Sequence, residues 1–315
     1  MVIILILFLK LIHKIIKWIA KVYIKHPNPI IRLIKKRIYQ SKYPSITIIT
    51  ATTKNHFNSA LAFISTVRNM TPHIKLVFYN LDTMYFPTSI YNYCKANGFT
   101  FKEFDYTKYP SWFQIESQLH QFNDRFYAGA YAWKSQIFYN ELLESKSDFV
   151  VWCDAGNMIM HSLEKKIKQS AQDEPISFYD LIALGPVTSF TTGHTIGVYT
   201  HPDTIALLGG ENYLDIEMKM GGFIVLNNKD PLAISLIKEW SHFCSLPEVV
   251  APIGASFQNH RYDQAVFSIL FYKYADQYGW TKHIGNIEKH ITVQNDKKYE
   301  HIYGKSRFSK KNLDL

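Results

Sequence analysis

Asp154 directly follows an apolar run at residues 149–153 and is itself followed by Ala155 and Gly156. Such a run predicts a buried strand, and ligands of an α/β sheet bind just beyond the carboxyl ends of its strands. A carboxylate at that edge is costly to desolvate unless it holds a hydroxyl, an N–H group or a cation. The sequence therefore predicts a ligand-binding acid at residue 154, and an Asp that caps the next turn or helix is the other interpretation.

Polar residues also follow the other predicted strands. Thr50, Ala51 and Asn55 lie at and beyond the end of the first, and Asp82 lies in the exit loop of the second. The sequence has no glycine-rich dinucleotide or P-loop motif, no zinc-protease motif and no serine-hydrolase motif. A nucleotide could still bind across the strand ends, held by these residues together with Asp154.

Short β-rich runs alternate with longer helical ones along the chain from Ser45. This alternation predicts an α/β fold with a mostly parallel sheet and helices on both faces. The predicted strands are 46–50, 75–79, 99–104, 149–153 and 223–227, and the predicted helices are 56–70, 89–97, 128–143, 231–243 and 263–274.

Composition narrows the class of protein further. The 315 residues are 47% hydrophobic, which is enough for a large core. The formal charge of +9 comes from lysines concentrated near the two ends, which favours membrane headgroups over nucleic acid as the partner. Three cysteines without a C-x-x-C pair exclude a disulfide framework and a zinc site of that spacing.

The N-terminal segment predicts attachment to a membrane. Residues 1–9 are uninterruptedly apolar but too few to span a bilayer, and the lysines that follow recur on one helical face. The segment fits an amphipathic helix in the headgroup layer or the flank of a short signal anchor, and a helix that docks on its own domain is the alternative. We expect residues 1–40 to form this anchor and stem, 45–304 the globular domain, and 305–315 a basic tail.

Six segments, in consistent order, resemble the GT-A nucleotide-sugar glycosyltransferases, and more closely a eukaryotic group of GT-A-like domains of unknown function. They are residues 48–57, 106–110, 131–134, 152–156, 221–227 and 263–264. The resemblance implies a GT-A-like, Rossmann-type sandwich. It also implies a nucleotide-sugar donor and a glycan, protein or lipid acceptor. The location it implies is the Golgi or ER membrane, whereas the lysines after the apolar run favour the cytoplasmic face.

In that family an Asp-x-Asp motif presents carboxylates to the ribose and to Mn²⁺ or Mg²⁺ on the diphosphate. By resemblance Asp154 holds the first acidic position, but Gly156 stands where a second acid is usual, so metal dependence is an open question. A basic side chain can neutralise a leaving diphosphate instead, and the resemblance gives this role to Lys134. A solvated helix lysine is the other interpretation of that residue.

The resemblance assigns the remaining site residues as well. Gly221 and Gly222 would allow a backbone to approach the donor sugar closely, and Asp263 with Gln264 would lie near the sugar that is transferred. A plain turn and a helix N-cap are the alternatives at these two places. His301 would be a late metal ligand, and His260 is the other histidine of interest.

We therefore expect a membrane-attached glycosyltransferase that transfers a sugar to a hydroxyl acceptor. Asp154, Asp263 and Gln264 would be the catalytic residues, and Thr50, Ala51, Asn55, Asp82, Lys134, Gly156, Gly221 and Gly222 would bind the donor. A non-catalytic GT-A-like module that binds a glycan or a partner is the alternative, and the missing second acid favours it. A methyltransferase is a third possibility, against which the absence of a glycine-rich loop after the first strand counts.

Overall fold

A computed structural model describes most of the chain beyond residue 42. The described residues are 43–71, 73–83, 85–114, 121–122, 125–126, 128–168, 171–172, 174–182, 185–281 and 291–293. Apart from Tyr43 they belong to the second of two units into which the chain divides, Pro44–Leu315. The anchor expected in residues 1–40, His301 and the tail 305–315 lie outside the described residues. Within these ranges, no helix has the length and hydrophobicity that a membrane crossing requires.

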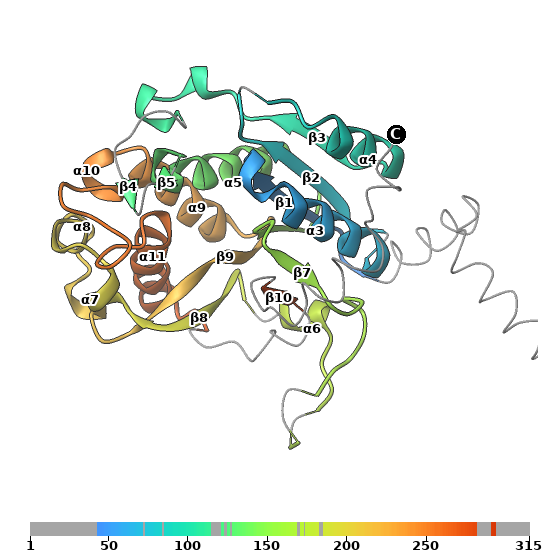
Figure 1. Ribbon diagram of the computed structural model, residues 1–315. Coiled ribbons are helices and arrows are strands. Elements are labelled where there is room, and N and C mark those ends of the chain that lie inside the picture. The colour runs from blue at the N-terminus through green and yellow to red at the C-terminus, as the bar shows by residue number, and fades with distance from the viewer. Residues whose placement is uncertain are drawn as a thin grey trace, which may run out of the picture. The chain divides into compact units, whose positions relative to one another are not determined.

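A six-stranded sheet in the order β3-β2-β1-β6-β9-β8 forms the centre of the domain (Figure 1). Neighbours among β3, β2, β1 and β6 pair in parallel, whereas β9 runs antiparallel to both β6 and β8. The strands are β1 (Ile46–Thr52), β2 (Lys75–Asn80), β3 (Thr100–Glu103), β6 (Phe149–Cys153), β8 (Val187–Thr195) and β9 (Glu217–Asn227). This is an α/β fold with a mostly parallel, mixed sheet of the Rossmann-like kind, so the predicted fold class is confirmed at this level.

Successive side chains of a strand point to opposite faces of the sheet, and in the central strands both sets are largely apolar. Helices therefore cover both faces. Ile49 of β1 and Trp152 of β6 belong to one large core cluster with residues of α5 (Ala132–Glu144), α9 (Pro231–Cys244) and α11 (Asp263–Tyr278). The opposite face is covered by α3 (Phe57–Met70) and by α4 (Thr88–Asn97), whose Tyr91 ring meets Phe101 edge-on. Both β1 and β6 are buried along their whole length.

Shorter elements complete the domain. They are β4 (Gln121–Phe122), β5 (Arg125–Phe126), β7 (Asn157–Ile159), β10 (Ile291–Val293), α6 (Phe178–Ile182), α7 (Ile196–Tyr199), α8 (Pro202–Leu208), α10 (Pro247–Val250), and the 3₁₀ turns η1 (Lys54–His56), η2 (Tyr106–Lys108), η3 (Ser111–Phe113), η4 (Ala128–Tyr131) and η5 (Glu211–Tyr213). The pair β7 and β10 forms a separate two-stranded antiparallel sheet, and so does the pair β4 and β5.

Two differences from the sequence prediction bear on the site. The helix predicted to begin at residue 128 begins at Ala132, because Gly129, Ala130 and Tyr131 have positive φ angles that interrupt a helix. Strand β8 was not predicted at all. Its second half is polar and partly exposed, and its pairing with β9 is interrupted by register shifts, so it lacks the regular alternation of a strand.

Candidate active site

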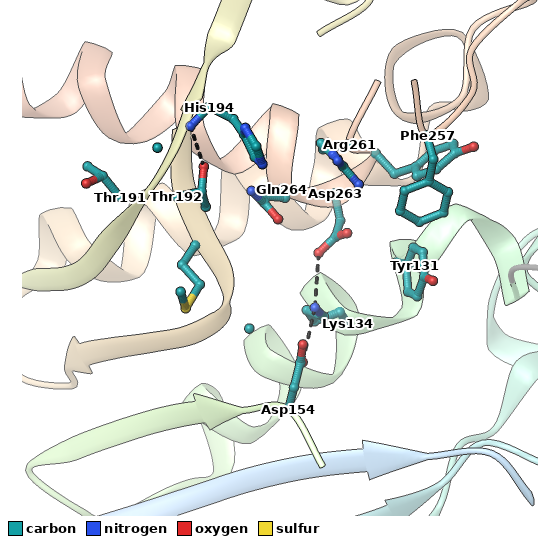
Figure 2. A pocket seen from close by; sticks show the side chains of 14 residues that line it. Tyr131, Lys134, Asp154, Thr191, Thr192, His194, Phe257, Arg261, Asp263 and Gln264 are labelled. Carbon is teal, nitrogen blue, oxygen red and sulfur yellow. Dashed lines mark hydrogen bonds and ion pairs between the residues drawn. The ribbon is translucent and has the colours of Figure 1, made fainter. Parts of the chain in front are cut away.

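A cavity of about 670 Å³ opens at the carboxyl end of β6, beside the first turns of α5 and α11 (Figure 2). Asp154, the acid predicted to bind a ligand at this edge of the sheet, lines the cavity. The lining residues are Tyr131, Lys134, Asp154, Thr191, Thr192, Gly193, His194, Met220, Gly222, Phe257, Arg261, Tyr262, Asp263 and Gln264. Five of the residues singled out in the sequence thus meet in one place: Lys134, Asp154, Gly222, Asp263 and Gln264.

Lys134 is held between two carboxylates. Its Nζ atom lies 3.2 Å from Oδ1 of Asp154 and 3.6 Å from Oδ2 of Asp263 (Figure 2). It also donates to the carbonyl of Gly221 over 3.3 Å. The side chain is 7% exposed and lies 5.5 Å from the centre of the Trp152 ring. The interpretation of residue 134 as a solvated helix lysine is therefore wrong. The ammonium is a buried, fixed positive charge at the edge of the sheet.

The electrostatics of this cluster follow from burial and mutual proximity. Burial lowers the pKa of Lys134, but the charges of Asp154 and Asp263 outweigh it, so the pKa lies above its ordinary value. Burial raises the pKa of Asp263 to about 6, although Lys134 acts in the opposite direction. Oδ2 of Asp263 also has no hydrogen-bond donor within the described part of the chain. Asp263 lines the cavity, whereas this oxygen of its carboxylate is itself buried against Lys134.

The carboxylate of Asp154 is oriented by the end of its own strand and by β9. The indole N–H of Trp152 donates to Oδ1 over 2.6 Å, and the Asp154 N–H donates to the carbonyl of Gly222 over 2.9 Å. The same Gly222 carbonyl accepts a hydrogen bond from the Asn157 amide at 2.9 Å. With 42% of its side chain exposed, Asp154 presents its remaining surface to the cavity.

The two glycines on β9 make room for these side chains. A β-carbon at Gly222 would lie 2.8 Å from Oδ2 of Asp154, and one at Gly221 would lie 3.1 Å from Cβ of Gln264. The groups that approach the Gly-Gly pair closely in the structure are the site's own side chains, and the approach of a donor sugar stays a prediction. Because the pair lies inside β9, a plain turn does not explain it.

The first turns of α5 and α11 are locked together through α9. Gln136 and Ser241 exchange two hydrogen bonds, of 2.5 and 2.8 Å, and the Trp240 indole donates to the carbonyl of Asp263 over 2.8 Å. Tyr131 and Tyr262, the residues before the two helices, have φ angles of 62° and 49°. Positive φ is strained for a tyrosine and tends to occur at functional sites. The fold thus maintains strain at both helix starts that border the cavity.

Sequence reasoning missed two walls of the cavity. Thr191, Thr192 and His194 come from β8, and Phe257 and Arg261 come from the segment before α11. Neither wall carries a motif. The local signal that could have indicated Arg261 is the polar run 258–264 at the start of the predicted late helix, in which His260, Asp263 and Gln264 are singled out but Arg261 is not.

Several predicted residues are not brought to the cavity. Thr50, Ala51 and Asp82 are absent from its lining, and the hydroxyl of Thr50 is buried without a hydrogen-bond partner in the described structure. The side chain of Asn55 is not among the parts of the chain that the structure describes. His260 is fully buried, with its ring bonded to the Val250 carbonyl and the His201 N–H. Gly156 is absent from the lining as well and lies two positions after Asp154 in the chain.

The described donor groups at this place do not fit a divalent cation. Among the described residues, no three His, Cys, Asp or Glu side chains are grouped so that they could hold a metal ion. The two carboxylates at the cavity already share the ammonium of Lys134. Mg²⁺ and Mn²⁺ require several oxygen ligands, so a metal would have to displace Lys134.

Comparison with known proteins gives little more. Residues 14–123 match the model of a protein family of unknown function, DUF1647. No curated protein matches the chain. Among solved structures, the apo structure of WbbM, a bifunctional glycosyltransferase, is similar with a TM-score of 0.43 and 15% identity, over 73% of this chain and 38% of that one. The chain therefore matches less than half of that protein's length, and we transfer nothing about activity from a similarity so distant.

Proposed function

We propose that this protein transfers a sugar from a nucleotide-diphosphate donor to a hydroxyl group of a glycan, protein or lipid acceptor. The observation that carries the proposal is the ammonium of Lys134, buried between Asp154 and Asp263 at the wall of a cavity at the carboxyl end of β6. The six segments that resemble GT-A glycosyltransferases support it independently.

The chemistry of such a transfer is largely positioning and neutralisation of charge. The bond between the anomeric carbon and the diphosphate oxygen breaks, and the bond to the acceptor oxygen forms. In this proposal Lys134 stabilises the charge on the departing diphosphate, and Asp154 accepts a hydrogen bond from a donor hydroxyl. The carboxylate of Asp263, which lines the cavity, would take the acceptor proton, a task that a carboxylate with a pKa of about 6 can perform at neutral pH.

The same geometry suggests how the reaction could proceed without a bound metal. The cation that would otherwise neutralise the diphosphate is replaced by a lysine that the fold already holds in place. Gly156 at the second acidic position is consistent with this arrangement, because a second carboxylate would have no metal to bind. We therefore include metal independence in the proposal.

A non-catalytic binding module is the second candidate, favoured by the missing second acid. A donor screen separates the two. The full-length chain is incubated with UDP- and GDP-sugars, with water as the default acceptor, and release of the nucleoside diphosphate is followed by mass spectrometry. A transferase releases diphosphate slowly from its own donor, and Asp154→Asn loses this release while melting at the wild-type temperature. Donor binding without any release, with and without added Mn²⁺, would establish the binding module instead.

Attachment to a membrane through residues 1–40 is a further part of the proposal. Fractionation of cells that express the full chain, beside a version that starts near Ser45, tests it. Recovery of both versions in the soluble fraction would refute membrane attachment but would not bear on the proposed chemistry.

A further inference from the structure

Arg261 places a second positive charge on the wall of the same cavity. It precedes α11 by two residues, and its N–H donates to the carbonyl of Tyr199 over 3.0 Å, so the backbone at this point is fixed to α7. Figure 2 shows its side chain on the same side of the cavity as Phe257 and Asp263. The residue is half-buried, and a charged group in such a position needs partners.

Aromatic rings hold the guanidinium group. Its central carbon lies 4.8 Å from the centre of the Tyr199 ring and 5.3 Å from that of Phe257. Cation–π contacts of this kind fix the plane of an arginine without using its N–H groups. The N–H groups of this guanidinium, a planar fork of hydrogen-bond donors, therefore remain available to a ligand in a defined orientation.

No acid of the described structure forms an ion pair with this side chain. Lys134 is paired with Asp154 and Asp263, whereas Arg261 has no carboxylate within ion-pair distance among the described residues. An arginine that is oriented, borders a cavity and lacks an acidic partner suits a ligand that brings its own negative charge. Guanidinium binds carboxylate, sulfate and phosphate groups through two parallel hydrogen bonds.

A ring platform lies next to this fork. Phe257 packs edge-on against Tyr131 and Tyr262, with ring centres 6.1 and 5.1 Å away, and all three residues line the cavity. Aromatic faces beside a charged anchor form a wall against which a sugar ring can lie. The strained backbone of Tyr262 directly follows Arg261, so the anchor and the platform are positioned by the same segment.

We propose that Arg261 is the specificity residue of the cavity and binds an oxyanion carried by the substrate, through both arms of its guanidinium. This inference rests on the proposed function and names the chemistry of its substrate. The oxyanion belongs either to the donor, as its diphosphate, or to the acceptor, as a carboxylate, sulfate or phosphate group on a glycan. The two sources share the same binding chemistry, and the probes chosen below distinguish them.

The test measures binding and requires no turnover. Inorganic pyrophosphate stands for the donor, and methyl glucuronide, with methyl glucoside as its neutral counterpart, stands for an anionic acceptor. Each is titrated by ligand-observed NMR into the full-length wild-type chain, Arg261→Met and Arg261→Lys. We expect one anion to lose at least about tenfold in affinity in Arg261→Met, the effect of losing a hydrogen bond to a charged group, and to lose less in Arg261→Lys.

Arg68→Met on α3 is the matched control, because it makes the same chemical change on a helix that does not line the cavity. Loss of pyrophosphate binding assigns the oxyanion to the donor, and loss of the preference for glucuronide over glucoside assigns it to the acceptor. Either result supports the proposal. Equal binding by wild type and Arg261→Met, or no binding of either anion to the wild-type chain, would overturn it.

The outcome is independent of catalysis. A chain that releases no diphosphate in the donor screen but binds an anion through Arg261 would refute the proposed transfer and retain this inference. If wild type and Arg261→Met turn over a donor equally well and bind both anions equally, the transfer is retained and the inference is refuted. Thermal melting of each variant shows whether a loss of binding reflects a loss of fold.

Discussion

Gly222 and Asp154 face each other across β9 and β6 so closely that the carboxylate fills the space of the missing side chain. The Asp154 N–H donates to the Gly222 carbonyl over 2.9 Å, and a β-carbon at residue 222 would lie 2.8 Å from Oδ2. Real β-carbons essentially never approach another atom so closely. The orientation of the carboxylate therefore depends on a glycine in the neighbouring strand.

Gly222→Ala should reduce transferase activity without unfolding the protein. The added methyl group forces the Asp154 carboxylate to rotate away from the Trp152 indole, and a displacement of about 1 Å at a catalytic group can cost on the order of 100-fold in rate. Because Asp154 is partly exposed, the carboxylate has room to turn, and the melting temperature should fall by only a few degrees. Steady-state rates and thermal melts measure the two effects.

Gly156→Ala is the control for this substitution. A β-carbon at Gly156 would meet no other atom within 4 Å, although the residue is only two positions from Asp154. The variant should retain wild-type activity. A similar loss of activity in both variants would mean that the effect does not come from contact with the carboxylate.

The sequence predicted the central sheet well because β1 and β6 are buried on both faces and read as continuous apolar runs. It missed β8, whose outer half carries Thr191, Thr192 and His194. Exposed polar residues in a strand with irregular pairing leave no periodic pattern. Strands that are buried in the core can be recognised from the sequence, whereas partly exposed strands that line a binding surface are harder to recognise.

The positions of some site residues could likewise be predicted from the sequence, but the contacts between them could not. Asp154 and Asp263 stood next to recognisable elements, so their placement followed from the ends of a strand and a helix. The role of Lys134 as the bridge between them, and of Trp152 as a hydrogen-bond donor, depends on how α5 packs over β6. No local pattern specifies this packing. It arises from contacts between residues far apart in the chain.

Removal of divalent metals should leave transferase activity unchanged. The ammonium of Lys134 already occupies the position between the two carboxylates, and the described residues offer no ligand set for a metal. Activity is measured before and after treatment with EDTA, and again after addition of Mn²⁺. A rate that falls at least tenfold with EDTA and returns with Mn²⁺ would contradict the metal-independent mechanism.

Lys134→Met should strongly reduce activity and also destabilise the protein. Removing the ammonium leaves the buried carboxylate of Asp263 without its cation, which costs on the order of 3 kcal/mol in the free energy of unfolding. The loss of positive charge beside the leaving diphosphate should slow transfer by about 100-fold or more. Denaturant titration and initial rates measure the two effects.

The double variant Lys134→Met with Asp263→Asn separates structure from catalysis. It removes one positive and one negative charge together, so most of the lost stability should return. Activity should not return, because the cation is still missing. If the double variant regained transfer, the role of Lys134 would be limited to neutralising Asp263.

Gly129→Ala should destabilise the protein by about 2 kcal/mol or more. Residue 129 has a φ of 47°, which costs a residue with a side chain about 1–2 kcal/mol, and the new β-carbon would lie 2.8 Å from Cα of Phe113. Gly279→Ala is the matched control, since residue 279 has a φ of 68° but no atom within 4 Å of a β-carbon. Denaturant unfolding should show the larger loss for Gly129→Ala, and equal losses would mean that contact with Phe113 contributes nothing.

The pH dependence of stability should identify Asp263. Burial raises its pKa to about 6 in the folded chain, from about 3.8 in an ordinary carboxyl group. Below pH 3.8 both states hold the proton, and between pH 4 and 6 the folded state keeps a proton that the unfolded state has released. Asp263 therefore contributes most to stability at acid pH, and this contribution is lost as the pH rises through 6. At about 1.4 kcal/mol per pKa unit, the loss is at most about 3 kcal/mol.

Asp263→Asn has no such titration and serves as the reference for this measurement. The free energy of unfolding of wild type minus that of the variant, from denaturant titrations at about pH 4, 5, 6 and 7, should fall across this window because only the wild type gives up a proton there. A difference that stays constant, or rises with pH, would show that the Asp263 carboxyl ionises as an ordinary or a stabilised acid. The proton-accepting role assigned to Asp263 would then lose its support.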